Sequence, residues 1–355
     1  MVEKMEKPKI ALYWCSSCGG CEESVLDLSG DILGIAEKID IVFWPVAMDF
    51  KYTDVEMMGD GEITASLING AIRTDDQEHM ARLLRKKSRM VIAHGSCAHL
   101  GGAIGLANFY SKRDIFDRIY KKIPSVKNPR GILPKVKTER VLRNDIRHNT
   151  IDKSERELGL PHFHERVKAL SQVIDVDYYI PGCPPTPELV KNAILAILQK
   201  ELPAKGSVFG EKRALCYTCS RIETKPDSVK IKKFKRVYEI KWDPTRCFLS
   251  QGIICLGIAT RGGCGERCIK ANMPCRGCFG PTDNVKDQGA KFLSALASII
   301  DSNNERELKK IVDSIPDPAG LFYRYSLASS ILKGKIGPSP VIARRSRSNL
   351  KIGSG

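Results

Sequence analysis

The cysteine content limits what this chain can be more than any other feature of its sequence. Thirteen cysteines occur in 355 residues, and eight of them lie between residues 216 and 278. The N-terminal sequence has neither an apolar export signal nor a twin-arginine pair, so we expect a cytoplasmic chain. Disulfides are reduced in that compartment, and the cysteines are therefore expected to bind metal or to take part in redox chemistry.

Composition and charge exclude several classes of protein. The chain is 42% hydrophobic and 28% charged, which excludes a wholly disordered chain, a collagen and a disulfide miniprotein. No apolar run reaches the length of a membrane span, so none is expected. The formal net charge of +16 predicts an electropositive surface, for which nucleic acid and an acidic partner subunit are both suitable partners.

The first two hundred residues predict alternating strands and helices. Helical spacing or capping residues indicate three helices, over 22–38, 75–87 and 187–200, the last with Thr186 as N-cap and Pro187 as its first residue. Short apolar runs predict five strands, over 10–14, 39–46, 63–68, 90–93 and 177–180. This alternation favours an α/β fold with a flavodoxin-like parallel sheet over residues 1–204.

Four cysteines follow three of the predicted strands. Cys18 and Cys21 come after the first strand, Cys97 after the fourth and Cys183 after the fifth. Sites in open parallel sheets form beyond the carboxyl ends of the strands. We therefore expect these four side chains to converge at one edge of the sheet.

The rest of the chain differs in character. Residues 112–165 are rich in lysine and arginine and are expected to form an inserted surface loop, either merely solvated or serving a partner. Residues 205–285 are loop-rich, so bound metal rather than an apolar core should supply much of their folding free energy. Residues 286–355 should contain a helix over 290–311, interrupted near Asn303 and Asn304, and a basic tail with Arg344, Arg345 and Arg347.

The eight C-terminal cysteines divide most simply into two further sets of four, Cys216, Cys219, Cys247, Cys255 and Cys264, Cys268, Cys275, Cys278. Zinc is the alternative ligand, since two close C-x-x-C pairs suit zinc ribbons. Zinc does not explain the N-terminal set, because a stable sheet needs no structural ion. Iron–sulfur clusters are therefore favoured, and three of them in one chain would form an electron-transfer route. Cys15 remains outside the sets and is expected to be a free thiol.

Six motifs together resemble the small subunit of nickel–iron hydrogenases, and most closely the methyl-viologen-reducing, heterodisulfide-reductase-associated group. They are Ser17-Cys18-Gly19-Gly20-Cys21-Glu22, Ile68-Asn69-Gly70-Ala71-Ile72-Arg73, Gly95-Ser96-Cys97-Ala98, Pro181-Gly182-Cys183-Pro184-Pro185, Thr260-Arg261-Gly262-Gly263-Cys264-Gly265 and Pro274-Cys275-Arg276-Gly277-Cys278. The resemblance covers residues from about 9 to 282 and implies a flavodoxin-like domain followed by a loop-rich iron–sulfur domain.

The resemblance also implies roles for the three sets and for partner proteins. The N-terminal set would hold a proximal 4Fe-4S cluster, Cys264, Cys268, Cys275 and Cys278 a medial one, and Cys216, Cys219, Cys247 and Cys255 a distal one. Relatives with proline at the position of Cys268 hold a three-iron medial cluster. The implied partners are the nickel–iron large subunit, a small iron–sulfur adaptor (delta) subunit and heterodisulfide reductase subunits, with no nucleic acid.

Three other classes of protein share some of these features. A deazaflavin-reducing hydrogenase subunit is disfavoured because the chain has no ferredoxin-type cysteine run, and the respiratory complex I subunit because it has no adjacent cysteine pair. A zinc-containing nucleic-acid-binding protein accounts for the charge, but aromatic residues for base stacking are sparse. Glu22 or Glu23 is either a proton relay or a helix-start acid, and His94 and His99 are expected to be packing residues rather than ligands.

Overall fold

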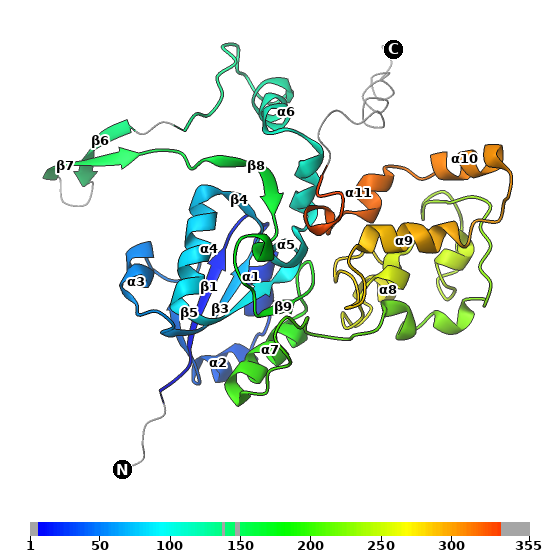
Figure 1. The fold of residues 1–355 in the computed structure, drawn as a ribbon, viewed down its shortest axis with the longest axis horizontal. Coiled ribbons are helices and arrows are strands. Elements are labelled where there is room, and N and C mark those ends of the chain that lie inside the picture. The colour runs from blue at the N-terminus through cyan, green and yellow to red at the C-terminus, as the bar shows by residue number, and fades with distance from the viewer. Residues whose placement is uncertain (1–5, 137–138, 146–149, 335–355) are drawn as a thin grey trace.

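The computed structural model describes residues 6–136, 139–145 and 150–334. An α/β half carries the N-terminus, and a second lobe contains the cysteine-rich segment and the helices after it (Figure 1). The predicted basic tail with Arg344, Arg345 and Arg347 lies outside the described residues.

The α/β half is built on five parallel strands in the order β2-β1-β3-β5-β9. Their bounds are β1 Lys9–Trp14, β2 Asp40–Phe43, β3 Ile63–Asn69, β5 Ser88–His94 and β9 Tyr178–Ile180. Numbered along the chain as five strands, this is the 2-1-3-4-5 order of flavodoxin-like sheets. The predicted fold class is confirmed, and the strands are largely apolar because helices cover both faces.

Two layers of helices pack on the sheet. One face meets α1 (Gly20–Leu26), α2 (Asp31–Ala36) and α7 (Pro187–Gln199), which share an apolar cluster with Leu12, Leu67 and Ile92. The other face packs against α3 (Tyr52–Met57), α4 (Asp75–Lys87) and α5 (Gly95–Leu100) through residues such as Met80 and Leu84. Alternate residues of each strand thus enter opposite cores.

Two of the three helices predicted in this half are confirmed, and each begins after a capping threonine. The helix predicted over 75–87 is confirmed as α4, and Thr186 caps α7 by accepting a hydrogen bond from the Leu189 amide. The single helix predicted over 22–38 is wrong. It divides into α1 and α2 because Ser29 adopts a left-handed conformation with φ of 54°, which ends a right-handed helix.

The basic insertion is more regular than the surface loop predicted for residues 112–165. It contains α6 (Lys112–Asp117), a π-helical turn (Arg118–Lys122) and an antiparallel pair, β6 (Glu139–Asp145) and β7 (Thr150–Leu158). Its last strand, β8 (Phe163–Lys168), pairs with β4 (Ile72–Thr74). The prediction of a loop was wrong: β6 and β7 are neighbours in sequence and pair with each other, whereas β8 finds its partner only in the folded chain. Figure 1 shows the β6–β7 pair standing away from the main sheet.

The C-terminal lobe is built from single turns and short helices. The turns are η4 Leu215–Tyr217, η5 Ile222–Thr224, η6 Leu249–Gln251 and η7 Leu256–Ala259, and the helices are α8 Arg267–Lys270, α9 Gln288–Ala297, α10 Glu305–Asp313 and α11 Pro318–Phe322. The predicted interruption near Asn303 and Asn304 is confirmed, since Asn304 caps α10.

This lobe does have an apolar core, contrary to the prediction for residues 205–285. Phe234, Leu249 and Leu256 pack with Phe292 and Phe322 from the helices that follow. The segment also has a smaller apolar cluster of its own around Phe248, and it completes the larger one with later residues. The chain then returns to the α/β half, where η8 (Leu327–Ser329) packs against α5 and the turns η1 (Ala103–Phe109).

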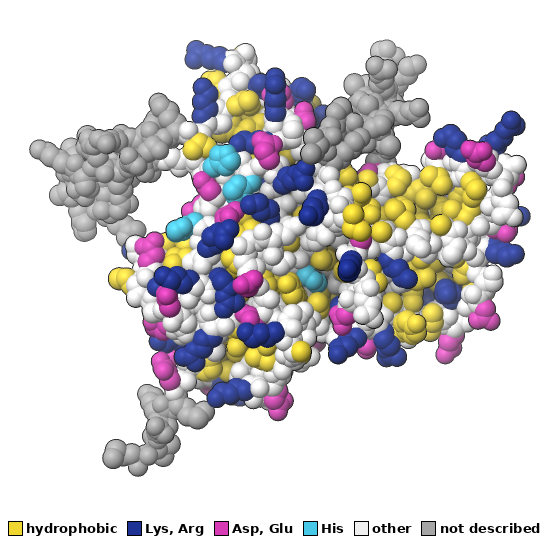
Figure 2. Space-filling model, viewed as in Figure 1, with side chains coloured by type: hydrophobic (Ala, Val, Ile, Leu, Met, Phe, Trp, Pro, Cys, Tyr) yellow, Lys and Arg dark blue, Asp and Glu magenta, His cyan; other side chains and the backbone are white. Residues whose placement is uncertain are grey.

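Two surface features bear on partners. Lysine and arginine side chains are scattered over the visible face, with acidic side chains between them (Figure 2). Among the described helices, none combines the length and apolar character that a bilayer crossing requires.

Candidate metal centres

The first cysteine set lies beyond the carboxyl ends of the strands. Cys18 and Cys21 follow β1, Cys97 lies in α5 directly after β5, and Cys183 follows β9. The four thiols are close enough to influence one another: burial raises the pKa of Cys21, and the charges of Cys97, Cys183 and Cys18 raise it further. The structure therefore brings together the four residues that the sequence placed at this edge.

Glycines let the backbone approach these thiols closely. A Cβ on Gly95, whose φ is +85°, would lie within 3.0 Å of the Cys21 Sγ. A Cβ on Gly102 would likewise collide with Cys97, and one on Gly20 would lie 3.5 Å from the Cys18 Sγ. Only glycine suits the first two positions, because both a side chain and its required backbone conformation are excluded.

The same set has an open and a closed side. Cys18 and Cys183 are exposed, whereas Cys21 and Cys97 are buried. Ala71 from the turn before β4 and Val167 from β8 pack on Cys97 and close that side. Beyond the motif that contains Ala71, no sequence signal indicated this β4–β8 cover.

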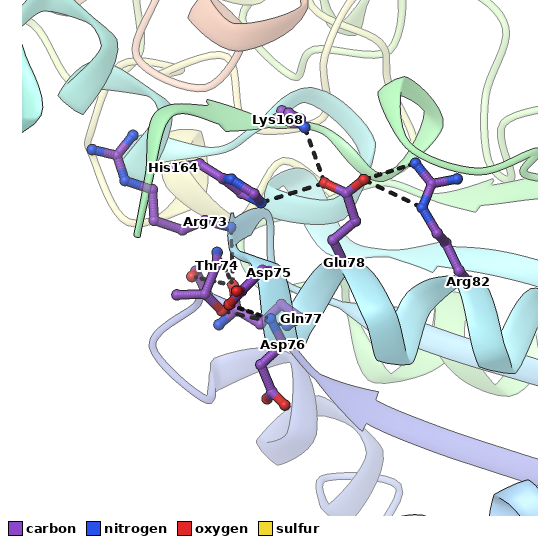
Figure 3. A network of polar contacts seen from close by, with 10 residues as sticks. Arg73, Thr74, Asp75, Asp76, Gln77, Glu78, Arg82, His164 and Lys168 are labelled. Atoms are coloured by element: carbon purple, nitrogen blue, oxygen red, sulfur yellow. Dashed lines mark hydrogen bonds and ion pairs between the residues drawn. The ribbon is translucent and has the colours of Figure 1, made fainter. Parts of the chain in front are cut away.

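A polar network fastens the β4–β8 cover to α4 (Figure 3). Glu78 of α4 accepts hydrogen bonds from Arg82 at 2.7 Å and from Lys168 of β8 at 3.0 Å, and its carboxylate lies 3.3 Å from His164 Nε2. Gln77 Oε1 accepts from the Arg73 amide at 2.9 Å. The wall over Cys97 is thus tied to α4 through Glu78 and Gln77.

Glu22 stands in the first turn of α1, as a helix-start acid would, but its side chain is buried. It is only 5% exposed, and its carboxylate accepts hydrogen bonds from Trp44 Nε1 and Asn69 Nδ2. Burial raises its pKa, against the lowering effect of these two donors. Glu23, in contrast, is exposed.

His94 is buried and His99 is half-buried, and both lie beside the first set. Burial lowers the pKa of His94 to about 4, and burial together with the charge of Arg261 lowers that of His99 to about 3. The His99 ring packs against Tyr179, with ring centroids 4.6 Å apart. Both side chains are therefore neutral packing groups at neutral pH.

The set Cys216, Cys219, Cys247 and Cys255 surrounds a common cavity. All four residues line it, together with Phe248, Leu249 and Gly257. Burial raises the pKa of Cys216 to about 12, with further increases from Cys255, Cys247 and Cys219. A glycine at 257 keeps the space open, since a Cβ there would lie 3.3 Å from the Cys216 Sγ.

The remaining set is Cys264, Cys268, Cys275 and Cys278. Burial raises the pKa of Cys278 to about 12, and the charges of Cys268, Cys183 and Cys264 add to this shift. Cys275 is buried next to Cys278 and to Cys255 of the neighbouring set. Within the described ranges, no three histidine, cysteine or acidic side chains lie close enough together to hold a single metal ion.

Direct contacts join the three sets in one order. Ser96, next to Cys97, donates its hydroxyl to the carbonyl of Cys278. The Cys275 amide donates to the Cys255 Sγ at 3.3 Å. The order from the sheet edge outward is therefore the Cys18 set, the Cys264 set and the Cys216 set.

The donor chemistry suits iron–sulfur clusters. Each set offers four thiols that hold no disulfide, and clusters of this kind are held by four cysteine thiolates. Backbone amides reach the sulfur of Cys255 from Gly257 and Cys275, which is the type of donor that tunes a cluster. Cys15 is a free thiol buried in an apolar cluster, where burial raises its pKa, and it belongs to none of the sets.

Comparison with known proteins agrees with this arrangement. Residues 18–197 match the family described as NADH ubiquinone oxidoreductase, 20 Kd subunit. The chain is 36% identical to the iron-sulfur subunit of the F420-non-reducing hydrogenase of Archaeoglobus profundus, over 92% of this chain and 98% of the relative. It is 34% identical to a subunit of the F420-non-reducing hydrogenase of Methanothermobacter thermautotrophicus (93% and 98%) and 35% identical to a subunit of the F420-non-reducing hydrogenase vhu of Methanocaldococcus jannaschii (92% and 97%).

Fold, thiol sets and family match define an iron–sulfur subunit of an oxidoreductase. More particularly, the chain belongs to the small-subunit family of nickel–iron hydrogenases, in the group that serves F420-non-reducing hydrogenases. The expected family is confirmed. As a hydrogenase small subunit, the chain pairs with a large subunit and works as part of an enzyme that acts on dihydrogen.

Proposed function

We propose that each cysteine set holds one 4Fe-4S cluster and that the chain conducts electrons between the large subunit and a further protein. The proximal site is Cys18, Cys21, Cys97 and Cys183, the medial site Cys264, Cys268, Cys275 and Cys278, and the distal site Cys216, Cys219, Cys247 and Cys255. The observation that carries this proposal is the order of contacts: Ser96, beside Cys97, donates to the Cys278 carbonyl, and the Cys275 amide donates to the Cys255 Sγ. Clusters of this type carry single electrons.

The residues around the sulfurs have distinct tasks in this function. Gly95 and Gly102, which lie directly against Cys21 and Cys97, let the backbone come close to the sulfurs of the proximal site. Apolar residues such as Phe248 and Leu249 keep water away from the distal site. Exposed Cys18 and Cys183 place the open side of the proximal site at the surface, where a large subunit can face it.

We also propose the acceptor side of the route. An adaptor (delta) subunit would receive electrons at the distal site and pass them to heterodisulfide reductase subunits. The names of the relatives, which belong to F420-non-reducing hydrogenases, support an acceptor other than the deazaflavin. Three further statements remain predictions: the chain is cytoplasmic, its partners include no nucleic acid, and its domains divide at residues 204 and 285.

The test begins with metal analysis of the hydrogenase complex purified without oxygen. Three four-iron clusters correspond to about twelve iron atoms in this chain. Cys247→Ser should remove about four of them and abolish electron delivery to heterodisulfide, while dihydrogen-dependent dye reduction at the large subunit persists. Cys15→Ala is the matched control, because Cys15 is buried outside every set, and its iron content should not change.

Two results would contradict the proposal. A colourless chain that contains zinc and no iron would favour zinc modules instead. Equal iron loss in Cys15→Ala and Cys247→Ser would show that the iron content reports folding and not ligand identity.

A further inference from the structure

A basic groove opens on the C-terminal lobe between residues 234–238 and the segment around α11. Its volume is about 350 Å³. Among the described residues that line it, four side chains are cationic and one is a carboxylate: Lys235, Arg236, Arg276 and Arg324 against Asp317. This size admits several side chains of a ligand.

The charge of the groove is not balanced from within. Asp317 caps α11, where its carboxylate accepts a hydrogen bond from the Gly320 amide at 3.2 Å. The Nε of Arg324 is buried and has no hydrogen-bond partner among the described residues. A buried donor without a partner is costly, so an acceptor supplied from outside would be favourable.

The wall of the groove is apolar. Val237 and Leu321 line it at half-buried positions above the buried Phe234 and Ile254, and Tyr238 at its side is 73% exposed. Hydrophobic side chains also gather on this lobe between α11 and α10 (Figure 2). Exposed aromatic residues combined with arginine are typical of the centre of a protein interface.

The groove lies next to the medial cysteines. Pro274 and Arg276, which line it, flank Cys275 on both sides. A hydrated inorganic anion would gain nothing from the apolar wall, whereas a peptide with acidic and apolar side chains would use both kinds of lining.

We propose that this groove binds an acidic segment, with apolar side chains, of a protein subunit that assembles with the chain. The cations hold the carboxylates of that segment, and the wall formed by Val237, Tyr238 and Leu321 covers its apolar side chains. The inference needs only that the chain is one subunit of a complex, so it does not depend on the number of clusters.

Charge reversal with a matched control tests the proposal. Lys235→Glu with Arg236→Glu changes two lining residues, and Lys232→Glu with Lys233→Glu makes the same charge change on exposed residues of the same segment that do not line the groove. In the anaerobically purified complex, the first pair should weaken the binding of the subunit that carries the acidic segment roughly tenfold. The binding should also depend less on salt concentration, because two charge contacts are lost. The control pair should leave retention within about twofold, and both should keep the wild-type iron content.

Photocrosslinking identifies the occupant directly. Tyr238→p-benzoylphenylalanine is tolerated sterically because Tyr238 is mostly exposed. A crosslink to a peptide of another subunit that is rich in Asp and Glu supports the proposal. Three results would overturn it. They are a crosslink to a second copy of this chain, equal weakening of retention by both variant pairs, and binding of added pyrophosphate in the groove with no crosslink to a protein segment.

Discussion

Replacing Gly95 by alanine should damage the proximal site selectively. Gly95 begins α5 with φ of +85°, and a Cβ there would lie within 3.0 Å of the Cys21 Sγ and 3.5 Å from the Gly182 carbonyl oxygen. The left-handed conformation costs an alanine about 1–2 kcal/mol. Overpacking against Cys21 adds about 1–3 kcal/mol, so the free energy of unfolding should fall by about 2–5 kcal/mol in total.

Gly206→Ala is the matched control for this experiment. Gly206 has φ of +84°, almost the same as Gly95, but nothing lies within 4 Å of an added Cβ. The free energy of unfolding of Gly206→Ala should therefore fall only by the cost of the left-handed conformation, about 1–2 kcal/mol. The difference between the two variants isolates the contact with Cys21.

Guanidinium unfolding and iron analysis of the anaerobic complex measure both effects. Gly95→Ala should lose about four iron atoms because the Cys21 sulfur must move, and Gly206→Ala should lose none. Full iron content in Gly95→Ala, or equal destabilisation of the two variants, would refute the argument that close backbone approach shapes the proximal site.

Three further changes test the C-terminal lobe. Asn304→Ala should destabilise the lobe by about 1 kcal/mol in urea unfolding, because Asn304 accepts from the amides of Arg306 and Glu307, whereas the neighbouring Asn303→Ala should not. Arg261→Met should cost about 2–4 kcal/mol by the same assay, since the buried guanidinium binds Asp283 and the Glu211 carbonyl oxygen; an unchanged midpoint would show that these contacts contribute nothing. Cys268→Pro should remove about one iron and give the paramagnetic resonance signal of a three-iron medial cluster, and an unchanged spectrum would exclude Cys268 as a ligand.

Local sequence rules predicted much of the α/β half. The helix over 75–87 and the cap at Thr186 depend on spacing and capping side chains within a few residues, and these are properties of the chain itself. The break at Ser29 was missed because a single left-handed residue leaves no periodic signal. The β4–β8 pair was missed because its strands are about ninety residues apart and short.

The buried state of Glu22 shows where reading the sequence locally fails. An acid at a helix start is ordinarily exposed, and only the folded chain brings Trp44 and Asn69 to its carboxylate. The same holds for the core of the C-terminal lobe, in which Phe234 packs with Phe292 from a helix outside the cysteine-rich segment. Contacts between distant residues have no signature in the composition of either segment.

The amino-acid sequence by itself determined the thiol content, the flavodoxin-like alternation and the edge at which Cys18, Cys21, Cys97 and Cys183 meet. Alternating strands and helices are a local pattern that implies a parallel sheet, and the carboxyl ends of parallel strands lie at one edge. The tertiary structure alone decided the cover over Cys97 and the basic groove beside Cys275. These features arise where loops from distant segments pack together, and packing depends on shape and burial, which spacing along a chain does not encode.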